Sequence, residues 1–300
     1  MRYQAVIAGC FGVLLALLPA ANAAAESRPH WVPTRADTFQ WDLQTPVPLT
    51  VAASVYDIDL FDNPPGVVQQ LHNMGRHVIC YVDVGSWENY RPDAKTYPAR
   101  ILGKSYPGYP DERFIDIRQL NVLGPILAKR FDLCRAKGFD AVEPDNIDTY
   151  QADTGFPITY RDQLVFNHWL VVQTHLRGLS IGQKNDGDQV RDLVGSFDWA
   201  LLEECFNQQF CTQFSPYVAS GKAVFDTEYR EDVSITTFLR QYCPNDRSYG
   251  YYLIYKKLAL DSYRVTCRGH VDTEHGFAIR LGGKEKRSPE FPPTVSSRSR

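Results

Sequence analysis

Three carboxylates and an amide gather within six residues of the segment 138–150, which reads GFDAVEPDNIDTY. The acids are Glu143, Asp145 and Asp148, and Asn146 lies between them. Like charges placed this close repel one another, so the grouping costs stability unless the protein uses it. Two carboxyl groups can cleave a glycosidic bond, because one donates a proton while the other acts as nucleophile or base.

Acids and amides also stand at or just beyond the ends of other short apolar runs. Those singled out, with neighbouring aromatic residues, are Tyr56, Asp57, Asp59, Tyr81, Asp83, Glu88, Asp116, Lys184, Asn185, Asp186, Glu203, Glu204, Glu228 and Tyr229. If the runs are the parallel strands of one barrel, their ends share one rim and these side chains converge on an acidic cup. Asp145 and Glu203 are the predicted catalytic pair, since each ends its own strand.

Each of these residues also has a plain structural interpretation. Asp145 and Asn146 are residue types that form turns by bonding backbone groups, and the alternative for Glu203 is an exposed edge charge. Asp148 is expected either to bind substrate or to cap the following turn. The aromatic rings at strand ends, Trp87 among them, can stack on a sugar or belong to the core.

Other kinds of site lack their signatures. The acidic segment does not have the 12-residue spacing or the central glycine of an EF-hand calcium loop. The sequence holds no G-x-S-x-G nucleophile motif, no phosphate-binding or dinucleotide-binding fingerprint, and no CxxC or HxxxH metal spacing. We therefore expect neither a metal nor a cofactor.

Short apolar strands alternate with amphipathic helices along the chain. The predicted strands are 39–43, 50–56, 77–84, 113–117, 139–143, 179–183, 199–204, 223–229 and 249–255, and the predicted helices are 66–75, 123–138, 161–178 and 232–242. Near-continuous apolar strands separated by helices indicate a parallel sheet covered on both faces. Eight or nine such strands over this length predict a single-domain α/β fold, a (β/α)8 TIM-type barrel.

The ends of the chain differ from this body. Residues 1–25 combine an early charge, an apolar stretch and an A-x-A-like site, as in a secretory signal, and 282–300 have the composition of a disordered tail. The barrel domain is thus predicted to span 26–281. We expect a secreted or surface-associated monomer, without a membrane span in the mature chain. The net charge of -3 shows no nucleic-acid footprint.

Six cysteines remain after the predicted signal, an even number that favours disulfides in an exported protein. Six cysteines allow 15 pairings, which a sequence alone does not resolve. Spacing favours Cys205 with Cys211 and Cys243 with Cys267, which leaves Cys80 with Cys134.

Four segments together resemble glycoside hydrolase family 114, the endo-α-1,4-polygalactosaminidases. They are VICYVDVGSWENYRPD (78–93), GFDAVEPDNIDTYQADTGFPIT (138–159), LSIGQKND (179–186) and LLEECFN (201–207). VYDIDLFD (55–62) and GKAVFDTEY (221–229) match as well, so the resemblance spans roughly residues 38 to 255. The order and combination of these motifs make the resemblance specific.

The resemblance implies a (β/α)8 barrel that cleaves inside chains containing α-1,4-linked galactosamine. It also implies that the catalytic carboxylates are those of the E-P-D-N and E-x-C-F motifs, here Asp145 and Glu203. The family often carries Asn before the second acid, whereas this chain has Leu202, which leaves one substrate contact in doubt. The substrate would be a cationic amino-sugar polysaccharide, which an acidic cup attracts.

The site residues expected from these arguments divide into two groups. Asp145 is the expected nucleophile and Glu203 the general acid/base, with retention of configuration; inversion would use the same two residues. The expected substrate-binding residues are Tyr56, Asp57, Tyr81, Asp83, Trp87, Glu143, Asn146, Asp148, Lys184, Asn185, Asp186 and Tyr229. The alternatives are a barrel glycosidase for another α-linked polysaccharide and a carbohydrate-binding barrel without activity.

Overall fold

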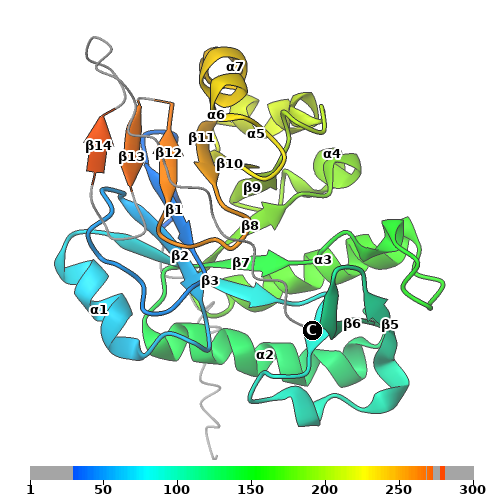
Figure 1. Ribbon diagram of the computed structural model, residues 1–300. Coiled ribbons are helices and arrows are strands. Elements are labelled where there is room, and N and C mark those ends of the chain that lie inside the picture. The colour runs from blue at the N-terminus through cyan, green and yellow to red at the C-terminus, as the bar shows by residue number, and fades with distance from the viewer. Residues whose placement is uncertain (1–29, 268, 273–277, 281–300) are drawn as a thin grey trace, which may run out of the picture.

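Eight parallel strands form a strongly curled sheet in the computed structural model, which describes residues 30–267, 269–272 and 278–280 (Figure 1). In spatial order they are β1 (Phe39–Asp42), β2 (Val55–Asp59), β3 (His77–Asp83), β7 (Ala141–Asp145), β8 (Ser180–Lys184), β9 (Trp199–Glu203), β10 (Val224–Tyr229) and β11 (Tyr252–Lys256). Each strand pairs in parallel with its neighbours. The predicted TIM-type barrel is therefore confirmed.

Helices lie outside the curled sheet and differ in length from one crossover to the next. They are α1 (Pro65–Asn73), α2 (Leu120–Lys137), α3 (Tyr160–His175), α4 (Val190–Leu193), α5 (Ser215–Ala219), α6 (Ile235–Thr237) and α7 (Cys243–Tyr249), with shorter turns η1 (Ala94–Thr96), η2 (Ala99–Ile101), η3 (Thr149–Gln151), η4 (Gly187–Gln189), η5 (Cys211–Phe214) and η6 (Phe238–Tyr242). A capping box between Thr159 and Asp162 starts α3, and Gly138 at φ 91° ends α2.

Strand alternation divides the apolar residues between two cores. In β3, Ile79 packs inside the barrel, whereas Val78, Cys80 and Val82 pack outside against the helices. In β9, Trp199 and Leu201 point inside in the same way. The Trp199 ring occupies the space where a Cβ on Gly182 would stand, at 2.6 Å, so glycine is needed at that position of β8.

The sheet opens between β1 and β11, where three short strands continue it. These are β12 (Arg264–Thr266), β13 (His270–Asp272) and β14 (Ala278–Arg280), and all three pair antiparallel. The buried Arg264 side chain donates to the Phe39 carbonyl over 2.7 Å and pairs with Asp272 at 2.9 Å. β12 is thereby tied to β1 as well as to β11.

The chain forms a separate antiparallel sheet in the segment that connects β3 to α2. It contains β4 (Ser86–Glu88), β5 (Leu102–Tyr106) and β6 (Tyr109–Ile115), in the order β4-β6-β5. The predicted strand 113–117 falls mostly in β6, so its assignment to the barrel was wrong. Asp116, expected on the barrel rim, instead forms an ion pair with Arg118 at 2.7 Å.

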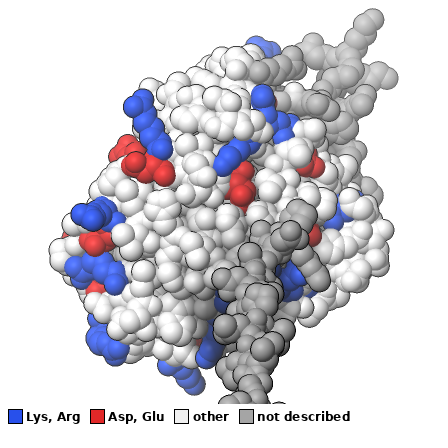
Figure 2. All heavy atoms as spheres, turned by 180° about the vertical axis from the view of Figure 1, so that it is seen from behind, with Lys and Arg blue, Asp and Glu red and all other residues white. Residues whose placement is uncertain are grey.

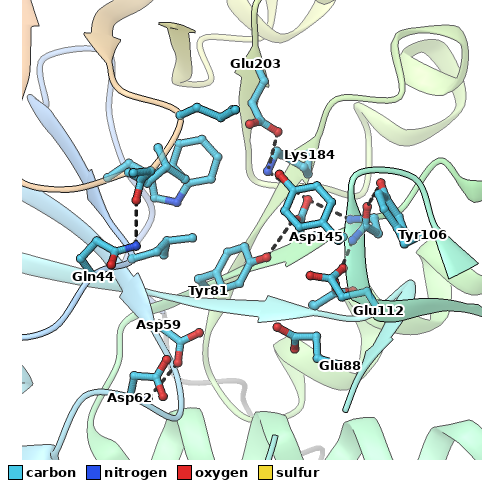
Figure 3. Close-up of a pocket in the computed structure, with 18 of the residues that line it drawn as sticks. Gln44, Asp59, Asp62, Tyr81, Glu88, Tyr106, Glu112, Asp145, Lys184 and Glu203 are labelled. Carbon is cyan, nitrogen blue, oxygen red and sulfur yellow. Dashed lines mark hydrogen bonds and ion pairs between the residues drawn. The ribbon is translucent and has the colours of Figure 1, made fainter. Parts of the chain in front are cut away.

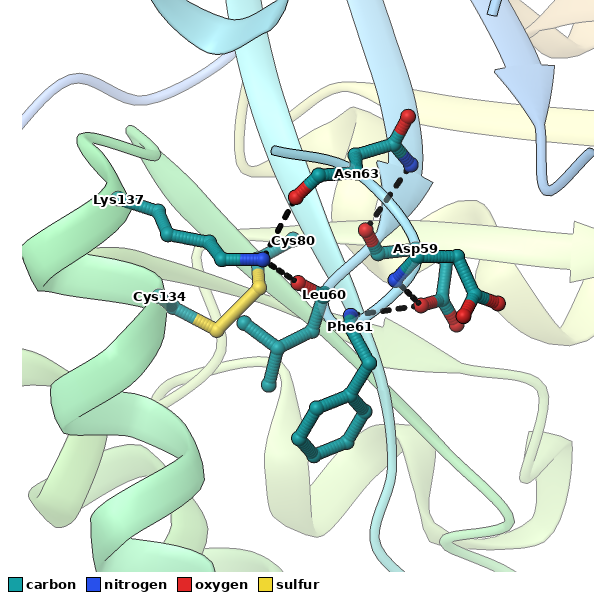
Figure 4. The surroundings of a disulfide bond; sticks show 8 residues. Asp59, Leu60, Phe61, Asn63, Cys80, Cys134 and Lys137 are labelled. Carbon is teal, nitrogen blue, oxygen red and sulfur yellow. Dashed lines mark hydrogen bonds between the residues drawn. A yellow bond between two sulfur atoms is a disulfide. The ribbon is translucent and has the colours of Figure 1, made fainter. Parts of the chain in front are cut away.

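The three disulfides join the cysteines that the spacing favoured, namely Cys80–Cys134, Cys205–Cys211 and Cys243–Cys267. Cys80 points out of β3 and meets Cys134 on α2, and Lys137 one turn further along α2 donates to the carbonyls of Leu60 and Asn63 (Figure 4). α2 is thus fastened both to β3 and to the loop that follows β2.

The surface seen from behind carries acidic and basic side chains interspersed, without a broad field of either sign (Figure 2). No helix among the described residues is long and apolar enough to cross a bilayer. The predicted signal, 1–25, and the predicted tail, 282–300, lie outside the described residues.

Candidate active site

A cavity of about 610 Å³ opens at the carboxyl ends of the barrel strands. Eight acids line it against two basic residues, Arg91 and Lys184. The acids are Asp59, Asp62, Asp83, Glu88, Glu112, Asp145, Asp148 and Glu203. The cavity therefore has an excess of negative charge, which favours a cationic ligand.

Lys184, the last residue of β8, occupies the centre of the acidic group (Figure 3). Its Nζ lies 2.8 Å from Glu143 Oε1, 3.0 Å from Asp145 Oδ1 and 3.1 Å from Glu203 Oε2. Burial lowers the pKa of Lys184, but the charges of its three acidic neighbours outweigh burial and hold that pKa well above its usual value. Lys184 thus supplies a permanent positive charge between the two predicted catalytic residues.

Asp145 ends β7 and accepts two hydrogen bonds besides its contact with Lys184. Tyr81 donates its phenolic O–H to Oδ2 over 2.9 Å, and the Asn146 backbone N–H donates to Oδ1 over 2.9 Å. Burial raises the pKa of Asp145, but the Lys184 charge and these hydrogen bonds outweigh it and lower the pKa below its ordinary value. The carboxylate is therefore ionised at neutral pH, as a nucleophile must be.

Glu203 ends β9 and remains partly open to the cavity, with 28% of its side chain exposed. Tyr229 on β10 donates a short hydrogen bond to Oε1, and Lys184 faces Oε2. Asn185 accepts from the Glu203 backbone N–H over 2.9 Å. The carboxyl group is held by neighbours from β8 and β10 yet faces the space where a ligand would lie.

A second acidic group lies beside Asp145, where β3 meets the small sheet. Ser86 Oγ stands 2.6 Å from Asp83 and 3.1 Å from Glu112, and Asn146 Nδ2 donates to Asp83 over 2.9 Å. Burial and the nearby charge of Glu88 raise the pKa of Asp83 to about 8 and that of Glu112 to about 7. These two carboxyl groups are therefore partly protonated near neutral pH when no ligand is bound.

The backbone turns in the left-handed region directly after three successive barrel strands. Asn146 has φ 62°, Asn185 and Asp186 have φ 45° and 59°, and Glu204 has φ 56°. Asn and Asp tolerate this region better than other non-glycine residues, because a short polar side chain bonds locally. The turn after β7 brings the Asn146 side-chain amide against Asp83, and the turn after β8 brings the Asn185 side-chain amide against Glu203.

Nine of the predicted site residues line the cavity together. They are Tyr81, Asp83, Asp145, Asn146, Asp148, Lys184, Asn185, Glu203 and Tyr229. Asp148 has its pKa raised to about 6 by burial and by the Asp145 charge. Residues from five separate strands or strand ends are thus brought to one place.

Five predicted residues, Tyr56, Asp57, Trp87, Glu143 and Asp186, do not line the cavity. Tyr56 points out of the barrel and donates to the Val51 carbonyl, because it alternates with the inward-facing Asp57. Asp57 and Glu143 point inward, but each is 0% exposed.

The remaining two residues face the protein rather than the cavity. Trp87 lies in β4 and donates its indole N–H to the Ala94 carbonyl over 3.0 Å. Asp186 is bonded by Tyr150 and Asn167 in the turn after β8. Leu202, which precedes Glu203, packs in the outer core and points away from the cavity.

The β5–β6 hairpin contributes three cavity residues that the sequence did not reveal, Tyr106, Tyr109 and Glu112. Tyr106 donates to the Asn146 side chain over 2.7 Å, and Tyr109 is half exposed above the cavity. The segment YPGYPDER offered a turn signal and two aromatic residues, but nothing in it located the hairpin over the barrel.

Two side-chain groups among the described residues have the spacing of metal ligands, and neither lines the cavity. One contains Cys205 and Cys211, which are joined in a disulfide. The other contains His30, His175 and Asp198 before β9, where His175 lies 2.8 Å from the Asp198 carboxylate.

Residues 20–272 match the sequence profile of glycoside-hydrolase family GH114. The chain belongs to this family. The resemblance drawn from the motifs is thereby confirmed, and the protein is a glycoside hydrolase. No curated protein matches the GH114 chain by sequence.

Solved structures support the same fold for this GH114 chain. Aspergillus fumigatus Ega3 in complex with galactosamine is 31% identical, with a TM-score of 0.73, over 80% of this chain and 98% of that one. The glycoside hydrolase domain of PelA from Pseudomonas aeruginosa is 16% identical, with a TM-score of 0.60, over 76% and 97%. An α-galactosidase from Thermus thermophilus in complex with stachyose, at 12% identity and a TM-score of 0.52, covers 78% of this chain and 64% of its own. At these low identities, the similarity to the PelA domain and to the α-galactosidase shows a shared fold and nothing more.

Proposed function

We propose that the protein is an exported endo-acting hydrolase of α-1,4-linked galactosamine polymers, with Asp145 as nucleophile and Glu203 as general acid/base. The observation that carries the proposal is the shared contact of both carboxyl groups with Lys184 at the floor of an acidic cavity. Ega3, whose structure holds galactosamine, is 31% identical to this chain. Three disulfides fit an oxidising, extracellular setting.

The shared contact with Lys184 brings the two carboxyl groups close enough for retention of configuration. Asp145 Oδ1 and Glu203 Oε2 both contact Lys184 Nζ, so these two oxygens are at most about 6 Å apart, the sum of the two distances. Inverting enzymes place their carboxyl groups about 6.5–9.5 Å apart, and retaining enzymes about 5–5.5 Å. Asp145, kept ionised, attacks the anomeric carbon, and Glu203 protonates the leaving oxygen and then activates water.

The excess of acids supports a preference for deacetylated polymer as part of this proposal. Galactosamine carries an ammonium group at neutral pH, and its contact with Asp83, Glu112 or Asp148 replaces a proton that those carboxyl groups otherwise retain. An N-acetylated sugar offers no charge to them.

The test incubates the mature chain with partially deacetylated and with fully N-acetylated α-1,4-galactosamine polymer and analyses the products by mass spectrometry. Short oligosaccharides from the deacetylated polymer, lost in Asp145→Asn and Glu203→Gln, are expected. Glu204→Gln is the matched control, because Glu204 adjoins Glu203 but its side chain accepts from Asn207 and Gln208 and does not line the cavity. Equal cleavage of both polymers would reject the amine preference, and no cleavage of either would favour a binding protein.

A further inference from the structure

Two carboxyl groups buried beneath Lys184 have no evident task in the proposed reaction. Asp57 on β2 and Glu143 on β7 are both 0% exposed inside the barrel. Glu143 Oε1 contacts Lys184 Nζ at 2.8 Å, so this pair is joined to Asp145 and Glu203 through a single ammonium group.

The other three oxygens of this pair accept no hydrogen bond from a donor among the described residues. Asp57 Oδ1 and Oδ2 and Glu143 Oε2 are shielded from solvent, and no N–H or hydroxyl of the described residues donates to them. The Asp57 and Glu143 carboxyl groups are close enough for each to influence the pKa of the other. Two ionised carboxylates would repel without a donor between them, so one of the two must retain a proton.

We propose that Asp57 and Glu143 share one proton, held on Asp57, and that this pair positions Lys184 and sets the charge it presents to Asp145 and Glu203. Asp57 then donates its O–H to Glu143 Oε2, and the ionised Glu143 accepts from Lys184 through Oε1. Burial, followed by the Glu143 charge, raises the pKa of Asp57 well above its usual value, in keeping with this arrangement.

This assignment builds on the proposed function, because it gives Lys184 a part in the reaction. In the retaining cycle, negative charge leaves Asp145 as the glycosyl ester forms, and it appears on Glu203 as that residue gives up its proton. Lys184 Nζ lies 3.0 Å from the Asp145 carboxylate and 3.1 Å from that of Glu203. It can therefore stabilise the negative charge on either residue without a change in its own position. The ionised Glu143, which contacts Lys184 from inside the barrel, partly offsets this positive charge.

The titratable groups that interact with the pair, directly or through Lys184 and Tyr229, come from five neighbouring strands. They are Tyr81 on β3, Asp145 on β7, Lys184 on β8, Glu203 on β9 and Tyr229 on β10. Trp41 on β1 adds no charge, but its ring lies 4.5 Å from Lys184 Nζ. Lys184 is the one basic group among these neighbours, so the charge of Glu143 bears on it directly.

The test compares the pH profiles of kcat/KM for isosteric variants of the pair. Glu143→Gln removes the tempering charge, so ionised Asp145 and Glu203 are both favoured, and the profile should move by about one unit to lower pH. Asp57→Asn retains a neutral donor toward Glu143, as a protonated Asp57 does, and should therefore keep the pH position of the wild-type profile. A Glu143→Gln profile identical to wild type, or an equal shift in Asp57→Asn, would overturn the proposal.

Asp226 provides a matched control on the outer face of β10. It is also 0% exposed and close enough to another acid, Glu228, for each to affect the pKa of the other, but neither residue lines the cavity. Asp226→Asn and Glu228→Gln should affect melting temperature without moving the pH profile. If they move the profile as Glu143→Gln does, the effect is structural and the proposal fails.

Infrared spectroscopy of the full chain provides a second readout that does not depend on activity. The difference spectrum between wild type and Asp57→Asn at pH 7 should show the loss of one protonated-carboxyl stretch. Absence of that band would reject the shared proton, even if the enzyme variants proved too unstable to assay. Activity retained in Asp145→Asn and Glu203→Gln would instead reject the proposed function, while the infrared result would still stand.

Discussion

Asn185 and Glu203 bond each other in both directions across β8 and β9. The Glu203 backbone N–H donates to Asn185 Oδ1 over 2.9 Å, and Asn185 Nδ2 lies 3.5 Å from Glu203 Oε2. One side chain therefore fixes both the backbone and the carboxyl group of the proposed acid/base.

Replacing this amide by an acid tests the relationship. Asn185→Asp substitutes a second negative charge for the donor that faces Glu203 Oε2, so kcat should fall by about tenfold or more. The change is tolerated by the left-handed backbone at φ 45°. Asn207→Asp is the control, because Asn207 donates to Glu204 outside the cavity in the same manner. Similar losses in both variants would contradict a specific role.

Tyr81→Phe should move the acidic limb of the activity profile to higher pH. The Tyr81 hydrogen bond is one of the interactions that lower the pKa of Asp145, so its removal lets that pKa rise and protonates the nucleophile earlier as pH falls. Tyr56→Phe, which removes a hydroxyl on the outer face of the neighbouring strand, should leave the limb in place. An unmoved limb in Tyr81→Phe would show that another group controls it.

Glu112→Gln should weaken the binding of deacetylated polymer above pH 7. The pKa of Glu112 is raised to about 7, so its charge grows as pH rises through that value, and KM for the cationic polymer should decrease. In the variant this decrease should be smaller. Asp111→Asn, which alters the adjacent acid outside the cavity, should retain the wild-type dependence. An identical pH dependence of KM in Glu112→Gln would exclude Glu112 as an ammonium contact.

Two disulfides should differ in what their removal affects. The Cys80–Cys134 bond closes 54 residues and the Cys205–Cys211 bond closes 6, so chain entropy assigns them about 4 and about 2 kcal/mol of stability. Cys205 follows Glu203 by two residues, however. We therefore expect the paired Cys→Ser change at 80 and 134 to lower the melting temperature more, and the change at 205 and 211 to lower kcat more. The reverse order in either measurement would refute this.

The folded protein should be more stable at pH 5 than at pH 8. Buried carboxyl groups such as Asp186, whose pKa is raised to about 8, bind protons more tightly in the folded than in the unfolded state. Their contribution is fully present below the unfolded pKa near 4 and is lost as pH rises through 6 to 8. Calorimetry at constant ionic strength should show a melting temperature at least about 5 °C higher at pH 5.

Asp186→Asn checks the cause of this slope. The amide cannot ionise, so the loss of stability between pH 5 and pH 8 should be smaller than in the wild type. Asp188→Asn, two residues further along in the same loop, should leave the slope unchanged. A slope that survives Asp186→Asn in full would assign it to other carboxyl groups.

The sequence predicted which segments form the barrel because apolar runs bounded by polar residues mark parallel strands. It could not say how deep each polar residue lies. Glu143 and Asp145 share one face of β7, but the two-residue step moves Glu143 below the cavity floor. Tyr56 and Asp57 were both expected at the site, although neighbours on a strand point to opposite faces.

The β5–β6 hairpin shows the second limit of sequence reasoning. The alternation in 113–117 resembles a barrel strand, and only its antiparallel pairing with β4 and β5 in the folded structure removes it from the barrel. Tyr106 and Glu112 reach the cavity through that tertiary placement, which depends on contacts far away in the sequence.

The left-handed turns after β7, β8 and β9 limit how this site can diverge. Asn146 and Asn185 each adopt the left-handed turn and also hydrogen-bond an acidic residue of the site. Each position therefore has to satisfy two structural requirements at once. Glycine would preserve the turn and lose the amide, and most other residues would lose both. We therefore expect substrate preference among related proteins to change through the β5–β6 hairpin and its aromatic residues, while the turns after β7, β8 and β9 stay unchanged.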